Sequence, residues 1–248
     1  MEERVPTGVA GLDELMGGGL PRGRSILLSG TCGTGKTTLA IQFLHNGVLK
    51  YGENGILLTL EQNADEIRKD MLSIGVDLKK LETEGKLTII DTSLSKFGIK
   101  DYMSPSELKE GSFTLRPGEF NIDNLLAVLT ETARKMNAKR IVIDSLPALD
   151  YLLKDVQDVR RILIQINYQL KISGLTTIII TEGEDEDGLS KHGVEEYISD
   201  GVIVMRINEA LDTRTIKIRK MRITKHSLKP TTFELTTSGV QIKAQKGL

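Results

Sequence analysis

The chain has 248 residues, of which 39% are hydrophobic and 27% are charged, a composition typical of folded proteins rather than disordered ones. Its 33 Lys and Arg residues nearly balance its 34 Asp and Glu residues, giving a formal net charge of -1, which argues against binding to nucleic acid or membrane by bulk charge alone. A single cysteine, Cys32, excludes an internal disulfide framework, and no apolar run approaches the roughly 20 residues of a membrane span. We therefore expect a cytoplasmic globular protein with one domain over residues 1–248.

Short apolar runs alternate with longer amphipathic stretches over the first 180 residues. The amphipathic stretches predict helices, and the apolar runs are nearly continuous, as in strands that are buried on both faces. This alternation predicts an α/β fold in which helices flank a mostly parallel sheet. The predicted strands are 25–29, 55–60, 87–90, 140–144 and 176–181, and the predicted helices are 36–50, 63–74, 121–137 and 154–173.

The pattern changes after residue 200 to consecutive strand-like segments. These predict an antiparallel extension at the edge of the sheet, with strands at 202–207, 213–221, 231–235 and 240–243. Segment 94–120 has no sustained period and is longer than a routine connection. Three interpretations of this segment stay open: a lid, an interface loop or a partly disordered insert.

A phosphate-binding pattern follows the first predicted strand. Gly30-Thr-Cys-Gly-Thr-Gly-Lys-Thr37 satisfies G-x-x-x-x-G-K-[ST] and opens the predicted helix 36–50. Glycines let successive backbone N–H groups curve around phosphate oxygens, and the helix N-terminus adds positive potential. Lys36 can then reach the β- and γ-phosphates, and the Thr37 hydroxyl can bind Mg²⁺. The motif predicts a nucleotide site.

Polar residues at the ends of three other predicted strands are candidates for the same site. Asp144 closes strand 140–144, where a carboxylate can hold the water shell of Mg²⁺, although a helix N-cap is the alternative. Glu61 follows strand 55–60 and can orient an attacking water, with a solvated side chain or a helix cap as the alternative. Thr181 and Glu182 end strand 176–181, where a γ-phosphate sensor and a purely structural role are equally consistent with the sequence.

Together with the lead-in segment 7–21 and the late segments 193–200 and 218–226, these residues resemble the KaiC-like branch of the RecA/RadA ATPases. The resemblance extends over essentially the whole chain. It implies a RecA-like P-loop core and a ring, usually hexameric, with ATP bound between neighbouring subunits.

The resemblance also implies roles for individual residues. Glu61 matches the catalytic glutamate, and Lys220 and Arg222 match cations donated across the interface to the γ-phosphate, which would stabilise the charge of the transferring phosphoryl group. Without the family, Lys220 and Arg222 are outward positions on a strand. The residues that match phosphate- and magnesium-binding positions are Gly33, Thr34, Gly35, Lys36, Thr37 and Thr38. The residues that match other nucleotide-contact positions are Ser73, Met221, Thr224, His226, Thr236 and Thr237.

The chain departs in three ways from the pattern of the KaiC proteins that it resembles. Glu61-Gln62 replaces a pair of glutamates, which keeps the first carboxylate and predicts slow hydrolysis. Only the isolated serines Ser190 and Ser199 lie where an adjacent Ser-Thr pair would be needed for autokinase activity, so we do not expect that activity. Cys32 at a variable P-loop position is read as a small tolerated side chain in preference to a redox gate.

Charge near the predicted ring axis bears on nucleic-acid binding. Segment 182–187 carries five carboxylates in six residues, which would repel a phosphate backbone; a solvated loop and a docking surface for a basic protein are its two interpretations. Basic residues between 214 and 229 should divide between two surfaces, because alternate residues on a strand share a face. We expect a nucleotide-dependent switch or scaffold with a protein partner; the alternative is a RadA-paralogue ATPase that binds single-stranded DNA in recombination or repair.

Overall fold

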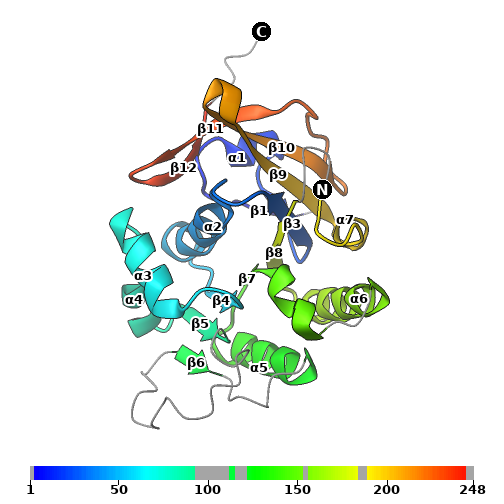
Figure 1. The fold of residues 1–248 in the computed structure, drawn as a ribbon. Helices are drawn as coiled ribbons and strands as arrows, with labels where there is room; N and C mark the ends of the chain where they lie inside the picture. Colours follow the sequence, from blue (N-terminus) through cyan, green and yellow to red (C-terminus); the bar gives the residue numbers. More distant parts are fainter. Residues whose placement is uncertain (1–2, 93–111, 115–121, 153–155, 184–188, 244–248) are drawn as a thin grey trace.

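The structure is a computed structural model that describes residues 3–92, 112–114, 122–152, 156–183 and 189–243. Within them a ten-stranded sheet runs in the order β12-β11-β10-β9-β3-β8-β7-β4-β5-β6 (Figure 1). Seven of its strands are parallel: β3 (Ser25–Gly30), β4 (Gly55–Thr59), β5 (Leu87–Asp91), β6 (Ser112–Thr114), β7 (Arg140–Asp144), β8 (Thr176–Glu182) and β9 (Gly201–Asn208). The antiparallel edge is formed by β10 (Thr213–Met221), β11 (Thr231–Thr236) and β12 (Gly239–Ile242), and a separate ribbon pairs β1 (Arg4–Val5) with β2 (Leu20–Pro21).

Helices cover both faces of the parallel strands. Figure 1 shows α2 (Lys36–Tyr51), α3 (Ala64–Ser73) and α4 (Leu78–Thr83) on one side, with α5 (Ile122–Lys135) and α6 (Val156–Ile172) on the other. Two short helices, α1 (Leu12–Leu15) and α7 (Glu195–Ile198), precede β2 and β9, and 3₁₀ turns occupy Leu146–Leu152 and Glu209–Leu211. None of the described helices is long and apolar enough to cross a membrane.

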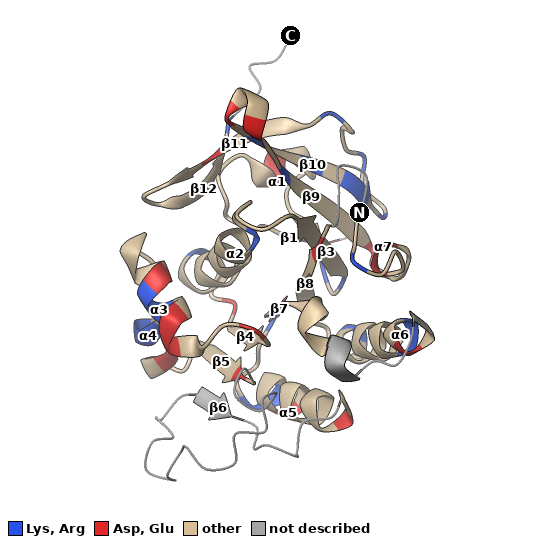
Figure 2. Cartoon of the chain, viewed as in Figure 1, with Lys and Arg blue, Asp and Glu red and all other residues tan. Residues whose placement is uncertain are grey.

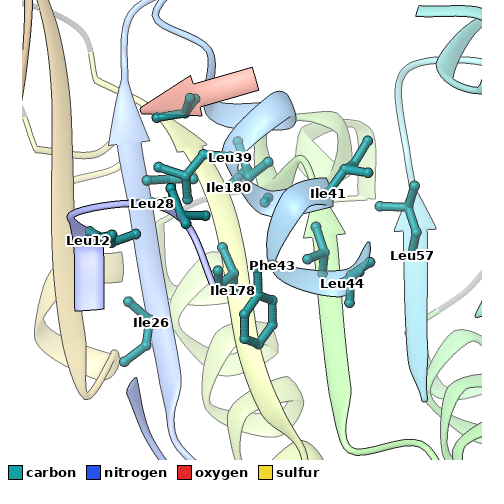
Figure 3. Close-up of a cluster of buried hydrophobic side chains, with 14 of the residues drawn as sticks. Leu12, Ile26, Leu28, Leu39, Ile41, Phe43, Leu44, Leu57, Ile178 and Ile180 are labelled. Carbon is teal, nitrogen blue, oxygen red and sulfur yellow. The ribbon is translucent and has the colours of Figure 1, made fainter. Parts of the chain in front are cut away.

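The core is divided by the sheet into two apolar clusters because strand side chains alternate between faces. Figure 3 shows the larger cluster, in which Leu39 and Phe43 of α2 pack on Leu28 and Ile178 of the sheet. Leu27, the neighbour of Leu28, belongs instead to the cluster under α5 and α6. The P-loop helix is therefore fixed by its apolar face against the centre of the sheet.

The order of the predicted strands and helices is confirmed, although the short elements α1, α7, β1 and β2 were not predicted and two further differences concern the sheet edge and α4. The predicted strand 202–207 pairs in parallel with β3, so the antiparallel extension begins only at β10. The helix α4 was not predicted; it has six residues, too few to repeat an apolar pattern over several turns, and it is capped by Asp77, whose side chain accepts from the Lys80 amide at 3.0 Å. Of the predicted insert 94–120, only β6 lies within the described residues.

Candidate active site

The P-loop joins the end of β3 to the start of α2 at the carboxyl edge of the parallel sheet. Gly33 and Gly35 have φ angles of 76° and 92°, in the left-handed region that favours glycine. At Gly30, a Cβ atom would lie 2.4 Å from the carbonyl oxygen of Met205 on β9, so that only glycine fits. The three glycines thus bend the loop around the N-terminus of α2, where free amides and the helix dipole favour an anion.

Lys36 closes the P-loop on itself. Its Nζ donates to the carbonyl oxygens of Gly30 at 2.7 Å and Thr31 at 2.9 Å. Burial lowers the pKa of Lys36, while the nearby carboxylates of Glu182 and Asp144 oppose that shift. The ammonium group is therefore held beside the phosphate cradle by two weak neutral acceptors, which a phosphate would outcompete.

Asp144 and Thr37 meet where β7 ends beside the first turn of α2. The Thr37 hydroxyl donates to Asp144 Oδ2 at 2.7 Å, and Asp144 is only 8% exposed. Burial raises the pKa of Asp144 to about 6, with Glu61 adding to the rise and the Thr37 hydrogen bond and Lys36 opposing it. Because the described partner of the carboxylate is Thr37, the contact favours the magnesium hypothesis over the helix-cap alternative. A hydroxyl and a carboxylate are the oxygen donors that Mg²⁺ prefers, so these residues fit that ion.

No cluster of three metal-ligating side chains occurs among the described residues. Mg²⁺ commonly binds one or two protein oxygens and completes its octahedral shell with water and substrate phosphates. Thr37 and Asp144 therefore suffice only when a nucleotide is bound in the adjacent loop.

Glu61 lies next to this pair, on the loop that follows β4. Register pairs Thr59 with Asp144, and the Leu60 amide donates to the Asp144 carbonyl at 2.6 Å, which fixes the loop on β7. The exposed Glu61 carboxylate accepts from the Ser145 hydroxyl at 2.8 Å. Ser145 was not predicted as a site residue; its place directly after Asp144 was the available signal.

Thr181 and Glu182 occupy different environments at the end of β8. Glu182 pairs with Gly30 and opposes the lowering of the Lys36 pKa more than any other carboxylate, which places it beside the phosphate cradle. Thr181 is buried, and its described partner is Glu195 Oε1 at 3.5 Å, not a P-loop residue. The described contact of Thr181 fits the structural role, and of the two residues only Glu182 lies beside the P-loop. Most of the acidic segment, residues 184–188, lies outside the described residues.

The β11–β12 hairpin brings Thr236 and Thr237 to the P-loop side of the molecule. Leu235 sits against Gly35, where a Cβ atom would be 2.8 Å from Leu235 Cδ2. Gln42 of α2 holds the hairpin by donating to the Ser238 carbonyl at 3.1 Å and accepting from the Val240 amide at 2.8 Å. Ser73 ends α3, where its hydroxyl donates to the Asp70 carbonyl at 2.6 Å and remains exposed.

The other predicted nucleotide contacts gather at the opposite edge of the sheet. Met221 pairs with Gly201, which pairs with Ile26 near the start of β3, whereas the P-loop begins after Gly30. Four residues of strand at about 3.3 Å each separate the two levels, a distance of about 13 Å. A pocket at this edge is lined by Arg219, Lys220, Met221, Arg222, Thr224, Lys225, His226 and Leu228.

Lys220 and Arg222 already have partners within the chain. Lys220 Nζ donates to the carbonyl oxygens of Glu196 at 2.9 Å and Ser199 at 2.7 Å, and Arg222 Nη1 lies 3.3 Å from Asp200 Oδ1. Burial lowers the pKa of Lys220, and the neighbouring Arg222 adds to this effect. The Met221 side chain is buried in the core, which leaves mainly its main chain to contact a ligand.

The basic residues of β10 border two hollows on the surface, although a bulge between Ile218 and Lys220 interrupts the regular alternation of the strand. Lys217 and Arg219 line a groove with Arg206 of β9, which lies outside the basic segment 214–229. Its remaining lining residues are Leu189, Val204, Thr215 and Pro230. Figure 2 shows Lys and Arg along β10, and Arg219 also borders the pocket of Lys220 and Arg222.

Comparisons with known proteins identify relatives over the whole chain. A family model described as "ATPase: KaiC" matches residues 5–247. Circadian clock oscillator protein KaiC of Prochlorococcus marinus (strain MIT 9313) is 36% identical over 97% of this chain and 46% of its own length, and that of Synechococcus elongatus is 36% identical over 96% and 44%. The chain thus spans less than half the length of these curated relatives. The crystal structure of a KaiC-like protein from the hyperthermophilic archaeon Pyrococcus horikoshii OT3 is 38% identical, covers 98% of this chain and 100% of its own, and superposes with a TM-score of 0.82.

Proposed function

The chain belongs to the KaiC family of ATPases, and we propose that it hydrolyses ATP slowly in a ring of several copies and acts as a nucleotide-dependent switch or scaffold. One observation carries the proposal. The P-loop and the Lys220–Arg222 cations lie at opposite edges of the same sheet, about 13 Å apart along the strand direction. One chain cannot bring both to one γ-phosphate, whereas head-to-tail contact between copies can, and such contacts close into rings.

Within a site of this kind, each residue of the chain has a separate task. The amides of the P-loop and Lys36 bind the phosphates, and Thr37 with Asp144 would hold the metal. Bound Mg²⁺ would offset the negative charge of the phosphates. Glu61 accepts a proton from, and orients, the attacking water, while Ser145 holds Glu61 from behind through its 2.8 Å hydrogen bond. Lys220 and Arg222 of the neighbouring copy stabilise negative charge on the transferring phosphoryl group.

Slow turnover and the lack of autokinase activity are supported by particular contacts. One oxygen of Glu61 already accepts from Ser145, which reduces its strength as a base, and Gln62 adds no second carboxylate. Ser190 and Ser199 are both buried; the Ser190 hydroxyl donates to the Glu196 carboxylate, and the Ser199 hydroxyl donates to the Glu195 carbonyl. Neither hydroxyl is presented as a phosphate acceptor.

The test is ATP turnover per chain measured over a range of protein concentrations, with Lys36→Ala as the blank. Turnover should rise as copies assemble and then reach a plateau, in step with the mass seen by light scattering. Glu61→Gln should bind ATP and assemble while losing about 10²-fold or more of kcat. Full turnover at concentrations where the chain is a monomer would contradict the shared site.

The basic groove of Arg206, Lys217 and Arg219 supports a second candidate, the RadA-paralogue function of binding single-stranded DNA. Cations suit a phosphate backbone, but none of the described lining residues is aromatic, so the groove lacks the stacking platform that single strands commonly use. Anisotropy of a labelled oligonucleotide tests it. Binding with a log–log salt slope of about −2, lost in Arg206→Ala/Lys217→Ala, would favour this function. Binding that is absent at low salt would exclude it.

A further inference from the structure

Asp200, which joins α7 to β9, is fully buried and lies among three cations. Its Oδ2 is 2.8 Å from Lys171 Nζ, and its Oδ1 is 3.4 Å from Arg24 Nη1 and 3.3 Å from Arg222 Nη1. A buried carboxylate needs such partners, because desolvation of an unpaired charge costs several kcal/mol. Three cations thus share this one buried carboxylate.

The distances distinguish Lys171 from Arg222. Charge-assisted hydrogen bonds are about 2.7–2.9 Å long, so Lys171 makes the close pair and Arg222 is held more loosely. The Arg222 side chain is also 50% exposed, whereas Asp200 has no exposed surface. Arg222 can therefore turn to a stronger anion while Lys171 continues to neutralise the carboxylate.

The main chain ties the same residues to the core. The Arg222 amide donates to the Asp200 carbonyl at 2.9 Å, and the Asp200 amide donates to the Ser25 carbonyl at 2.9 Å. Lys220 is held by the carbonyls of Glu196 and Ser199, directly before Asp200. The segment ending at Asp200 therefore fixes both cations relative to β3, the strand that leads to the P-loop.

We propose that Asp200 is a positioning residue for hydrolysis: it holds the Arg222 guanidinium loosely at the edge of the sheet, ready to reach the γ-phosphate bound by a neighbouring copy. This inference rests on the shared site proposed above. Asp200 acts through Arg222 and does not touch the nucleotide. Its loss leaves Arg222 charged but free to adopt other rotamers, and misplacement of about 1 Å at a reacting centre costs up to about 100-fold.

A double-mutant cycle on the full chain tests this inference, using Asp200→Asn, Arg222→Ala and the double variant. We expect Asp200→Asn to lower kcat about tenfold with the KM for ATP changed less than about twofold, since the P-loop is untouched. In the Arg222→Ala background, Asp200→Asn should cause no further loss of kcat. Asp212→Asn, an exposed carboxylate in the β9–β10 turn, is the matched control and should keep wild-type kcat.

The outcomes separate the two proposals. Wild-type kcat in Arg222→Ala would overturn the shared site and this inference with it. A loss in Arg222→Ala that is multiplied by a similar loss from Asp200→Asn in the double variant would overturn only the positioning role, because a merely structural residue acts in both backgrounds.

A second variant keeps the inference testable if Asp200→Asn does not fold. Lys171→Met removes the closest cation from Asp200 and leaves Arg222 as a main counter-charge of the buried carboxylate. Arg222 should then be drawn inward, lowering kcat about threefold or more, with no effect in the Arg222→Ala background. An unchanged kcat in Lys171→Met would overturn the positioning role.

Discussion

The two edges of the sheet hold their functional groups in different ways. At the carboxyl edge, side chains contact one another directly: Thr37 with Asp144 at 2.7 Å, and Ser145 with Glu61 at 2.8 Å. At the amino edge, Lys220 binds main-chain carbonyls of the segment before β9, and Arg222 shares the carboxylate of Asp200 with two other cations.

Because of this difference, substitutions at the two edges should affect the reaction and the stability of the fold to different extents. The carboxyl edge is a set of side chains placed on rigid strand ends, so a change there should alter the reaction more than the stability of the fold. The amino edge uses the same cations to satisfy buried carbonyl and carboxylate groups, so a change there should affect both.

Replacing Asp144 is the most severe test of the carboxyl edge. Asp144→Asn removes the charge that would hold Mg²⁺, and we expect kcat to fall at least about 100-fold. Stability should not fall, because a neutral amide avoids the burial cost of the carboxylate. Steady-state turnover and thermal unfolding measure the two effects, with the exposed Asp70→Asn as control. A large loss of stability with retained turnover would reverse the comparison.

The pKa of Asp144 sharpens the same point. Burial raises it to about 6, and the metal requires the ionised form. Turnover at limiting Mg²⁺ should therefore fall about tenfold per pH unit below pH 6, and higher Mg²⁺ should move this limb to lower pH because the metal and the proton compete.

The pH dependence of the free energy of unfolding has the opposite sign to that of turnover. Because the folded pKa lies above its ordinary value of 3.8, protonation of Asp144 favours the nucleotide-free fold below that value, and this contribution is lost as the pH rises through about 6. Chemical unfolding at pH 5 and pH 7 measures the contribution as the difference between wild type and Asp144→Asn. If the fall of turnover at low pH does not move when the Mg²⁺ concentration is raised, that fall belongs to a group other than Asp144.

Lys220→Ala tests the amino edge. It removes the donor to two carbonyls as well as the cation, so we expect the free energy of unfolding to fall by about 1–2 kcal/mol and kcat to fall several-fold. Lys225→Ala, in the same pocket, is the control. If Lys220→Ala lowers kcat without lowering stability, the amino edge responds to substitution in the same way as the carboxyl edge, and the comparison fails.

At the β11–β12 hairpin we expect an effect on stability alone. Gln42→Ala removes two hydrogen bonds and leaves the buried Val240 amide unpaired, which should cost about 1–2 kcal/mol. The melting temperature should fall by about 2–6 °C, while the exposed Gln241→Ala changes it less. Equal shifts in the two variants would show that Gln42 does not fasten the hairpin.

The carboxyl edge could be predicted from sequence because its residues stand beside regular elements. The Gly30–Thr37 motif is contiguous, and Asp144 and Glu61 each follow an apolar run, so a parallel sheet brings them to one edge. Ser145 was missed because its only signal is its place directly after Asp144, and serine is common after strands.

The amino edge could be predicted only by resemblance. The contacts of Lys220 and Arg222 depend on the register of β9 and β10, which includes a bulge between Ile218 and Lys220 that shifts the alternation. The role of Asp200 depends on Lys171 and Arg24, which are distant in sequence and reach it only in the folded chain. Hydrophobic periodicity carries no information about such pairings.

The strand register places Met221 opposite Gly201, at the end of the sheet away from Gly30. If each site is completed by two chains, this placement predicts complementation between inactive variants. In the proposed ring, a Lys36→Ala chain is defective in its own site but intact as a donor, and an Arg222→Ala chain is the reverse. Two inactive proteins should then complement each other: random mixing in equal amounts restores roughly one quarter of the interfaces. A chain that carries both defects would instead be dominant over wild type, because it inactivates one site on each side of itself.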